Sequence, residues 1–188
     1  MSDDKPQQTS SINNKTFFEK VMQLFTSEPS NRNELFDVLN NAENRELINP
    51  ETKQMIEGVL EVSEIHVRDI MIPRSQMITL EVNQPLDEFL SVIIKSGHSR
   101  FPVVNDDIDH IEGILLAKDL LAFGFNQKTG DATLKNLIRP AIIVPESKKV
   151  EPLLQEFRSN RYHMAIVVDE YGGVSGLVTI EDILELIV

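Results

Sequence analysis

Residues 67–188 of this 188-residue chain contain the same pattern twice, and this repeat is the strongest constraint on the fold. Segments 67–73 and 134–140 both alternate apolar and polar residues and end in a proline. Three later segments recur in the same order: 86–90 as 150–154, 101–104 as 165–168, and 113–121 as 176–184. Two copies of one unit therefore fill this part of the chain.

The spacing of apolar residues predicts the same element order in both copies. Short strands at 78–80 and 142–144 are each followed by an amphipathic helix, and Gly97 ends the first of these helices. A hairpin and a last helix complete each copy; the hairpins pair 101–104 with 111–116 and 164–168 with 174–179. The unit is β-α-β-β-α, which predicts an α+β fold. One copy of about 55 residues is only marginally stable alone, so the two copies are expected to pack together.

The residues before the repeat differ from it in character. Residues 1–33 are predicted to be a disordered or weakly helical leader, in which 16–25 forms either a docking helix or a helix on a membrane surface. Residues 34–66 are predicted to be a helical extension with helices at 34–45 and 50–62, and Asn49 caps the second. The positions expected to face inward are Leu35, Val38, Leu39, Ala42, Met55, Ile56, Val59 and Leu60.

Charge and composition exclude several classes of function. Eighteen basic and thirty acidic residues give a net charge of −12, which disfavours binding to nucleic acid. The chain has no cysteine, so disulfides, thiolate metal sites and cysteine nucleophiles are excluded. No apolar run is long enough for a membrane span, and the polar start lacks a secretory segment. A cytoplasmic protein is expected.

The last strand of each copy is followed after three residues by an aspartate, Asp119 or Asp182. With the tandem β-α-β-β-α order, this pattern resembles a pair of CBS domains, which sense adenosyl nucleotides. The segments 67–74, 99–102, 163–173 and 176–185 narrow the resemblance to the soluble, short branch of the CorC magnesium and cobalt efflux family. The resemblance covers residues 34–188 and implies CBS domains at 67–126 and 134–188.

The resemblance also implies a biological setting. It implies that the chain is a regulatory module of magnesium and cobalt efflux and that its two CBS domains form a pseudo-twofold pair. It also implies a homodimer, a membrane cation transporter as partner, and a peripheral position of this protein on the inner membrane. Family members continue into a C-terminal domain that resembles a flavin-binding module, whereas this sequence stops at Val188. We expect it to be a shortened form, with any flavin site in the part beyond it.

The resemblance places AMP or ATP, with or without Mg²⁺, in clefts between the two copies. Asp182 would accept the ribose hydroxyls, Thr179 would donate its hydroxyl, and Arg100 and His163 would contact phosphate. Asp119 is the matching acid of the first copy. The remaining candidate nucleotide contacts are Ser99, Phe101, Pro102, Met164, Ile78 and Ile143.

Each of these assignments has a simpler alternative. Thr179 and Asp182 also fit a helix capping box, although Leu116 replaces the threonine in the first copy, where no such box can form. This difference predicts weaker binding in the Asp119 cleft. Arg100 could instead be a surface arginine, and His163 a buried structural histidine. Residues 106–110 could bind a metal, but a solvated turn is favoured because the spacing of a binding loop is absent.

Three functions remain open at this point. The favoured one is a nucleotide-binding regulatory module, and the alternatives are a constitutive dimerisation module without ligand and a nucleotide hydrolase. No catalytic triad, carboxylate pair or metal-ligand spacing supports catalysis, so an enzyme is not expected. The last helices, with Leu120, Leu121, Ile183, Leu184, Ile187 and Val188, are the predicted dimer face.

Overall fold

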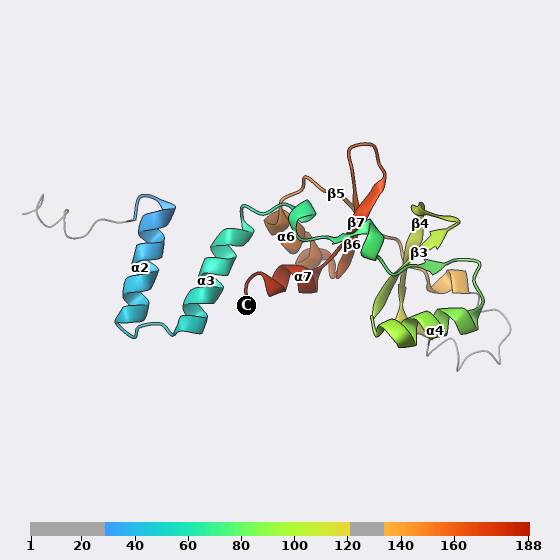
Figure 1. The fold of residues 1–188 in the computed structure, drawn as a ribbon, viewed down its shortest axis with the longest axis horizontal. Helices are drawn as coiled ribbons and strands as arrows, with labels where there is room; N and C mark the ends of the chain where they lie inside the picture. Colours follow the sequence, from blue (N-terminus) through green and yellow to red (C-terminus); the bar gives the residue numbers. More distant parts are fainter. Residues whose placement is uncertain (1–28, 121–133) are drawn as a thin grey trace, which may run out of the picture. The chain divides into compact units, whose positions relative to one another are not determined.

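The computed structural model describes residues 29–120 and 134–188 (Figure 1). Chain contacts divide it into two units, residues 1–53 and 54–188, which are treated separately. The predicted helix at 16–25 and Leu121 of the predicted dimer face lie outside the described residues.

The first unit contains helix α2 (Arg32–Asn44) and the start of helix α3 (Pro50–Val62). Asn31 caps α2 by accepting a hydrogen bond from the Glu34 N–H at 3.0 Å. Asn49 accepts from the Thr52 N–H at 2.7 Å, which confirms its predicted capping role. Val38 is 47% exposed, so its predicted inward position is wrong.

The rest of α3 belongs to the second unit, and only a narrow stripe of its surface is buried. Gly58 and Val62 are its buried residues, whereas Met55, Ile56 and Val59, which the spacing places inside, are exposed. A Cβ on Gly58 would lie 2.6 Å from the Leu186 carbonyl oxygen. Only glycine therefore lets the C-terminal segment approach this closely, and the buried face of α3 is the one that carries Gly58 and Val62.

Both copies of the repeat have the predicted β-α-β-β-α order. The first contains β2 (Leu80–Glu81), α4 (Leu86–Ser96), β3 (Arg100–Asn105) and β4 (Asp107–Leu116), with residues 117–120 helical. The second contains β5 (Ile143–Pro145), α6 (Val150–Asn160), β6 (Met164–Val168), β7 (Val174–Thr179) and α7 (Ile180–Glu185). The predicted strands at 78–80 and 142–144 are displaced by one or two residues toward the C-terminus.

The segment before each copy crosses to the sheet of the other copy. Strand β1 (Ile72–Pro73), flanked by the 3-10 turns η1 (Val67–Asp69) and η2 (Arg74–Gln76), precedes the first copy but pairs with β7 of the second. Its sheet has the order β1-β7-β6-β5, and the other sheet is β2-β3-β4. Before the second copy, the turn η4 (Leu134–Leu137) leads to Arg139, which bridges Ile114 in β4. The two copies are thus interlocked (Figure 1).

Three apolar clusters form the core. One lies under β5, β6 and α6, with Leu153, Phe157 and Ile183 almost fully buried. A second lies under β2, β3 and α4 around Phe89 and Phe101. The third joins the copies through Ile114, Ile166, Val174 and Leu177. Leu120 and Ile183 are buried in these cores, so they cannot form the predicted dimer face; Leu184 and Val188 are exposed.

Candidate functional site

A cleft of about 350 Å³ opens where the two copies meet. Its polar lining comes from the start of α7, with Thr179, Glu181 and Asp182, and from the start of β3, with Ser99 just before the strand and Arg100 as its first residue. The other lining residues are mainly apolar: Ile72, Gln76, Met77, Ile78, Gly97, His98, Pro102, Met164 and Leu177. An apolar pocket with a few polar groups at one end is the usual form of a small-molecule site.

Thr179 and Asp182 form the capping box at the start of α7. The Thr179 N–H and hydroxyl both donate to Asp182 Oδ2 at 2.7 Å, and the Asp182 N–H donates to Thr179 Oγ1 at 3.2 Å. The hydroxyl proton of Thr179 is thereby used, so Thr179 is not a free donor. Asp182 Oδ1 accepts no hydrogen bond from a described residue, and a carboxylate has lone pairs for several. The capping role therefore leaves one oxygen of Asp182 available to a ligand.

Seven of the eleven predicted contacts line this first cleft, and His163, Asp119, Phe101 and Ile143 do not. Those that do are Ile78, Ser99, Arg100, Pro102, Met164, Thr179 and Asp182. Phe101 is fully buried between β3 and α4, so it offers no wall to a ligand. Ile143 is 61% exposed and lines neither cleft between the copies, whereas its neighbour Ile142, just before β5, lines the second cleft.

Arg100 and His163 converge on a carboxylate that sequence reasoning missed. Glu181 Oε1 lies 3.6 Å from Arg100 Nη1 and 3.9 Å from His163 Nδ1. The side chain of His163 is 46% exposed, so it is not the buried structural histidine of the alternative interpretation. The signal that could have identified Glu181 is its place in the repeat, where the first copy has Lys118.

A second cleft, of about 530 Å³, is also lined by residues of both copies. Arg100 and Met164 occupy equivalent positions at the starts of β3 and β6, and both line both clefts. The second cleft also contains His163. Its remaining lining residues are Ile114, Leu116, Lys118, Arg139, Pro140, Ile142, Asn160, Arg161 and Tyr162.

Asp119, the counterpart of Asp182, is engaged differently. Its Oδ2 accepts a hydrogen bond from Arg139 Nη2 at 2.7 Å, and its side chain is 21% exposed. Arg139 belongs to the segment that crosses from the second copy. The sequence does not show this pair, because nothing local links two residues on different elements.

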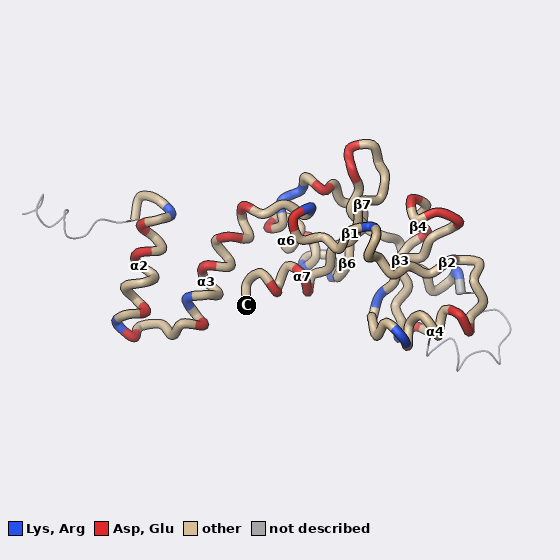
Figure 2. Tube along the Cα trace, in the orientation of Figure 1, with Lys and Arg blue, Asp and Glu red and all other residues tan. Residues whose placement is uncertain are grey.

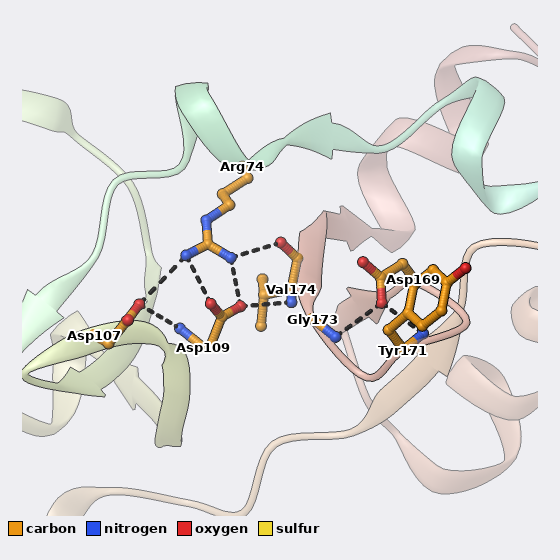
Figure 3. A network of polar contacts seen from close by, with 7 residues as sticks. All are labelled: Arg74, Asp107, Asp109, Asp169, Tyr171, Gly173 and Val174. Carbon is orange, nitrogen blue, oxygen red and sulfur yellow. Dashed lines mark hydrogen bonds and ion pairs between the residues drawn. The ribbon is translucent and has the colours of Figure 1, made fainter.

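The hairpin between β3 and β4 carries acidic residues at its tip, 106–110 (Figure 2). This tip binds an arginine (Figure 3). Arg74 forms a two-pronged ion pair with Asp109, and its Nη2 lies 3.3 Å from Asp107 Oδ1. Asp109 Oδ1 also accepts from the Val174 N–H at 2.8 Å. The hydrogen bond from Arg74 and then that from Val174 lower the pKa of Asp109, and the same ion pair raises the pKa of Arg74. Within the described ranges, no group of three or more His, Asp or Glu side chains is arranged to hold a metal ion.

None of the helices in residues 29–120 and 134–188 is both long and apolar enough to cross a membrane.

Comparison with known proteins agrees with this architecture. The CBS domain model matches residues 67–125 and 134–188, and the model for the N-terminal region of NMB0537 matches residues 27–62. The magnesium and cobalt efflux protein CorC of Salmonella typhimurium is 56% identical over 190 residues, which cover all of this chain. This chain spans 65% of the length of that relative.

Two solved structures hold nucleotides. The CBS domain of the bacterial CNNM/CorC family Mg²⁺ transporter in complex with ATP is 40% identical, with a TM-score of 0.67, and the match covers 73% of this chain and 97% of that one. A CBS-domain pair with bound AMP from Klebsiella pneumoniae is 29% identical, with a TM-score of 0.56, and the match covers 64% of this chain and 96% of that one. The chain belongs to the CorC family and is a tandem CBS-domain module of that family.

Proposed function

We propose that this chain is a regulatory module that binds an adenine nucleotide in the first cleft. The observation that carries the proposal is Asp182, which lines a largely apolar cleft together with Arg100 and whose Oδ1 accepts no hydrogen bond from a described residue. The ATP and AMP complexes of related CBS domains support the same class of ligand. The broader role is magnesium and cobalt efflux, as in the CorC relatives.

The residues of the cleft suit the three parts of a nucleotide. Ile78 and Met164 offer apolar surface to the adenine ring, and Asp182 Oδ1 accepts hydrogen bonds from the ribose hydroxyls. The guanidinium of Arg100 matches phosphate oxygens. His163, which lines the second cleft and lies 3.9 Å from Glu181 of the first, is proposed as a second phosphate contact, with Mg²⁺ as a companion of ATP. Phe101 and Ile143 have no part in this assignment.

Glu181 supplies a means of regulation. It lies beside both Arg100 and His163, so an incoming phosphate must compete with this carboxylate for the same two groups. Nucleotide binding then releases Glu181 and biases the contact between α7 and β3. A ligand shifts a conformational equilibrium only through such a difference in contacts.

The proposal also covers the binding partners of the protein and its location in the cell. A second copy would contact exposed Leu184 and Val188, and a membrane cation transporter would receive the signal at the cytoplasmic face of the inner membrane. We propose binding without hydrolysis.

Thermal unfolding with adenosine, AMP and ATP tests the proposal. A ligand that binds only the folded state at a hundred times its Kd stabilises by about 2.7 kcal/mol, so AMP and ATP should raise Tm. Arg100→Ala should reduce the shift caused by ATP at least about threefold and leave the shift caused by adenosine unchanged. Absence of any shift would favour a constitutive dimerisation module, and release of phosphate from ATP would favour a hydrolase.

A further inference from the structure

The second cleft concentrates positive charge in an otherwise acidic chain. Arg100, Lys118, Arg139 and Arg161 line it together with His163, and none of its described lining residues is acidic. The whole chain carries a net charge of −12, so this gathering of cations is a local exception. A cleft with walls of one sign attracts ligands of the other sign.

Part of this charge has no internal partner. Arg100 is paired with Glu181 and Arg139 with Asp119. Lys118 and Arg161, in contrast, form no ion pair with any residue of the described ranges 29–120 and 134–188. Two cations therefore stand in the same cleft without a described counter-charge.

The backbone of Arg161 points to the same conclusion. Arg161 ends α6 in the left-handed conformation, with φ of 57°, where glycine is the favoured residue. The equivalent residue of the first copy is Gly97, with φ of 71°. The second copy thus has an arginine at a position where glycine would fit the backbone better, and its side chain lines the cleft.

The cleft is poorly suited to a nucleoside. Asp119, the counterpart of the ribose acceptor, is paired with Arg139 at 2.7 Å and is not a lining residue of this cleft, and Leu116 stands where the first cleft has Thr179. Ribose hydroxyls therefore meet no carboxylate among the described lining residues, whereas phosphate oxygens have several guanidinium and ammonium donors. With about 530 Å³, the cleft also has room for a small hydrated anion.

We propose that the second cleft binds a small phosphate-dense anion without a ribose, of the inorganic diphosphate class, through Lys118 and Arg161. Arg100 and Arg139 complete the donor set once the anion competes with their carboxylate partners. This site is separate from the nucleotide cleft, although Arg100 borders both. The alternative occupant of this site is the phosphate chain of a nucleotide bound in the first cleft, and the experiment distinguishes it from a free anion.

Calorimetric titration of the full chain with inorganic pyrophosphate, at low ionic strength and without divalent metal, tests this site. We expect one site per chain. Arg161→Gly, which suits the left-handed backbone and so retains the fold, should weaken binding at least about tenfold, as should Lys118→Gln. Arg158→Gln is the matched control, because Arg158 is on α6 outside this cleft, and it should change affinity less than about twofold.

Two further arms separate this proposal from the nucleotide site. Asp182→Ala should leave pyrophosphate affinity unchanged, and Arg161→Gly should leave AMP affinity unchanged. If pyrophosphate does not bind, if Arg158→Gln weakens it as much as Arg161→Gly, or if Asp182→Ala abolishes it, the second site does not exist. If ATP but not free pyrophosphate responds to Arg161→Gly, the phosphate chain of a nucleotide is the occupant and the proposal is overturned. Failure of AMP to bind would overturn the nucleotide proposal alone.

Discussion

Asp109 joins three segments of the chain through one carboxylate. It pairs with Arg74 after β1, extends from the first hairpin, and accepts the Val174 N–H at the start of β7 (Figure 3). The sequence predicts a solvated turn at this acid and does not reveal its two partners, since both lie far away along the chain. Residues that act through local patterns, such as Thr179 and Asp182, could be found from the sequence, whereas Glu181 and Arg139 needed the tertiary structure.

The lowered pKa of Asp109 makes its contribution to stability depend on pH. An acid whose pKa is lower in the folded state stabilises the fold above its unfolded-state pKa of about 3.9, and this contribution is lost as the pH falls through the folded-state value. Asp109→Asn should therefore destabilise the protein at about pH 7, with a difference from the unmodified chain that shrinks below about pH 4.

Urea unfolding at a series of pH values measures this difference. Asp106→Asn is the control, because Asp106 lies on the same tip in a left-handed conformation that asparagine tolerates, and it should change stability little. A difference for Asp109→Asn that stays constant down to about pH 3 would show that the ion pair with Arg74 does not stabilise the fold.

The crossing segments explain the equivalent glycines in β4 and β7. A Cβ on Gly113 would lie 2.2 Å from the Arg139 carbonyl oxygen, and one on Gly176 would lie 2.3 Å from that of Ile72. Helices, hairpins and the capping of α3 follow from local spacing and turn residues, so the sequence predicts them. The sequence does not predict that the segments before each copy pair with the sheet of the other copy, because the repeat pattern assigns each segment to the copy that it precedes.

Gly176→Ala tests this exchange. The added methyl group forces the backbone of β1 away from β7, and such overpacking costs about 1–3 kcal/mol of unfolding free energy. Gly97→Asn is the control, since open space surrounds Gly97 and asparagine tolerates its positive φ; the change should cost well under 1 kcal/mol. Equal stability of Gly176→Ala and the unmodified chain in denaturant unfolding would contradict the close crossing of β1 over β7.

At the scale of the whole molecule, one repeated fold supports two clefts of different chemistry. The β-α-β-β-α order was predictable, because both copies repeat the same apolar pattern, and it makes the clefts equivalent in position. Different residues at equivalent positions of the two copies then make the clefts different. Thr179 of the second copy corresponds to Leu116 of the first, Glu181 to Lys118, and Arg161 to Gly97. The first cleft has the carboxylate of Asp182 among its lining residues, whereas none of the described residues that line the second cleft is acidic.

The measurement that tests this account most directly is calorimetric titration of the chain with ATP, compared between Asp182→Ala and Asp119→Ala. Loss of a charge-assisted hydrogen bond worth about 1.5–3 kcal/mol should make Asp182→Ala bind ATP at least about tenfold more weakly. Asp119→Ala should change the affinity less than about threefold. Asp182→Asn, which keeps an acceptor for the Thr179 N–H, controls for loss of the cap. Equal weakening by Asp182→Ala and Asp119→Ala, or ATP affinity unchanged by Asp182→Ala, would contradict the account.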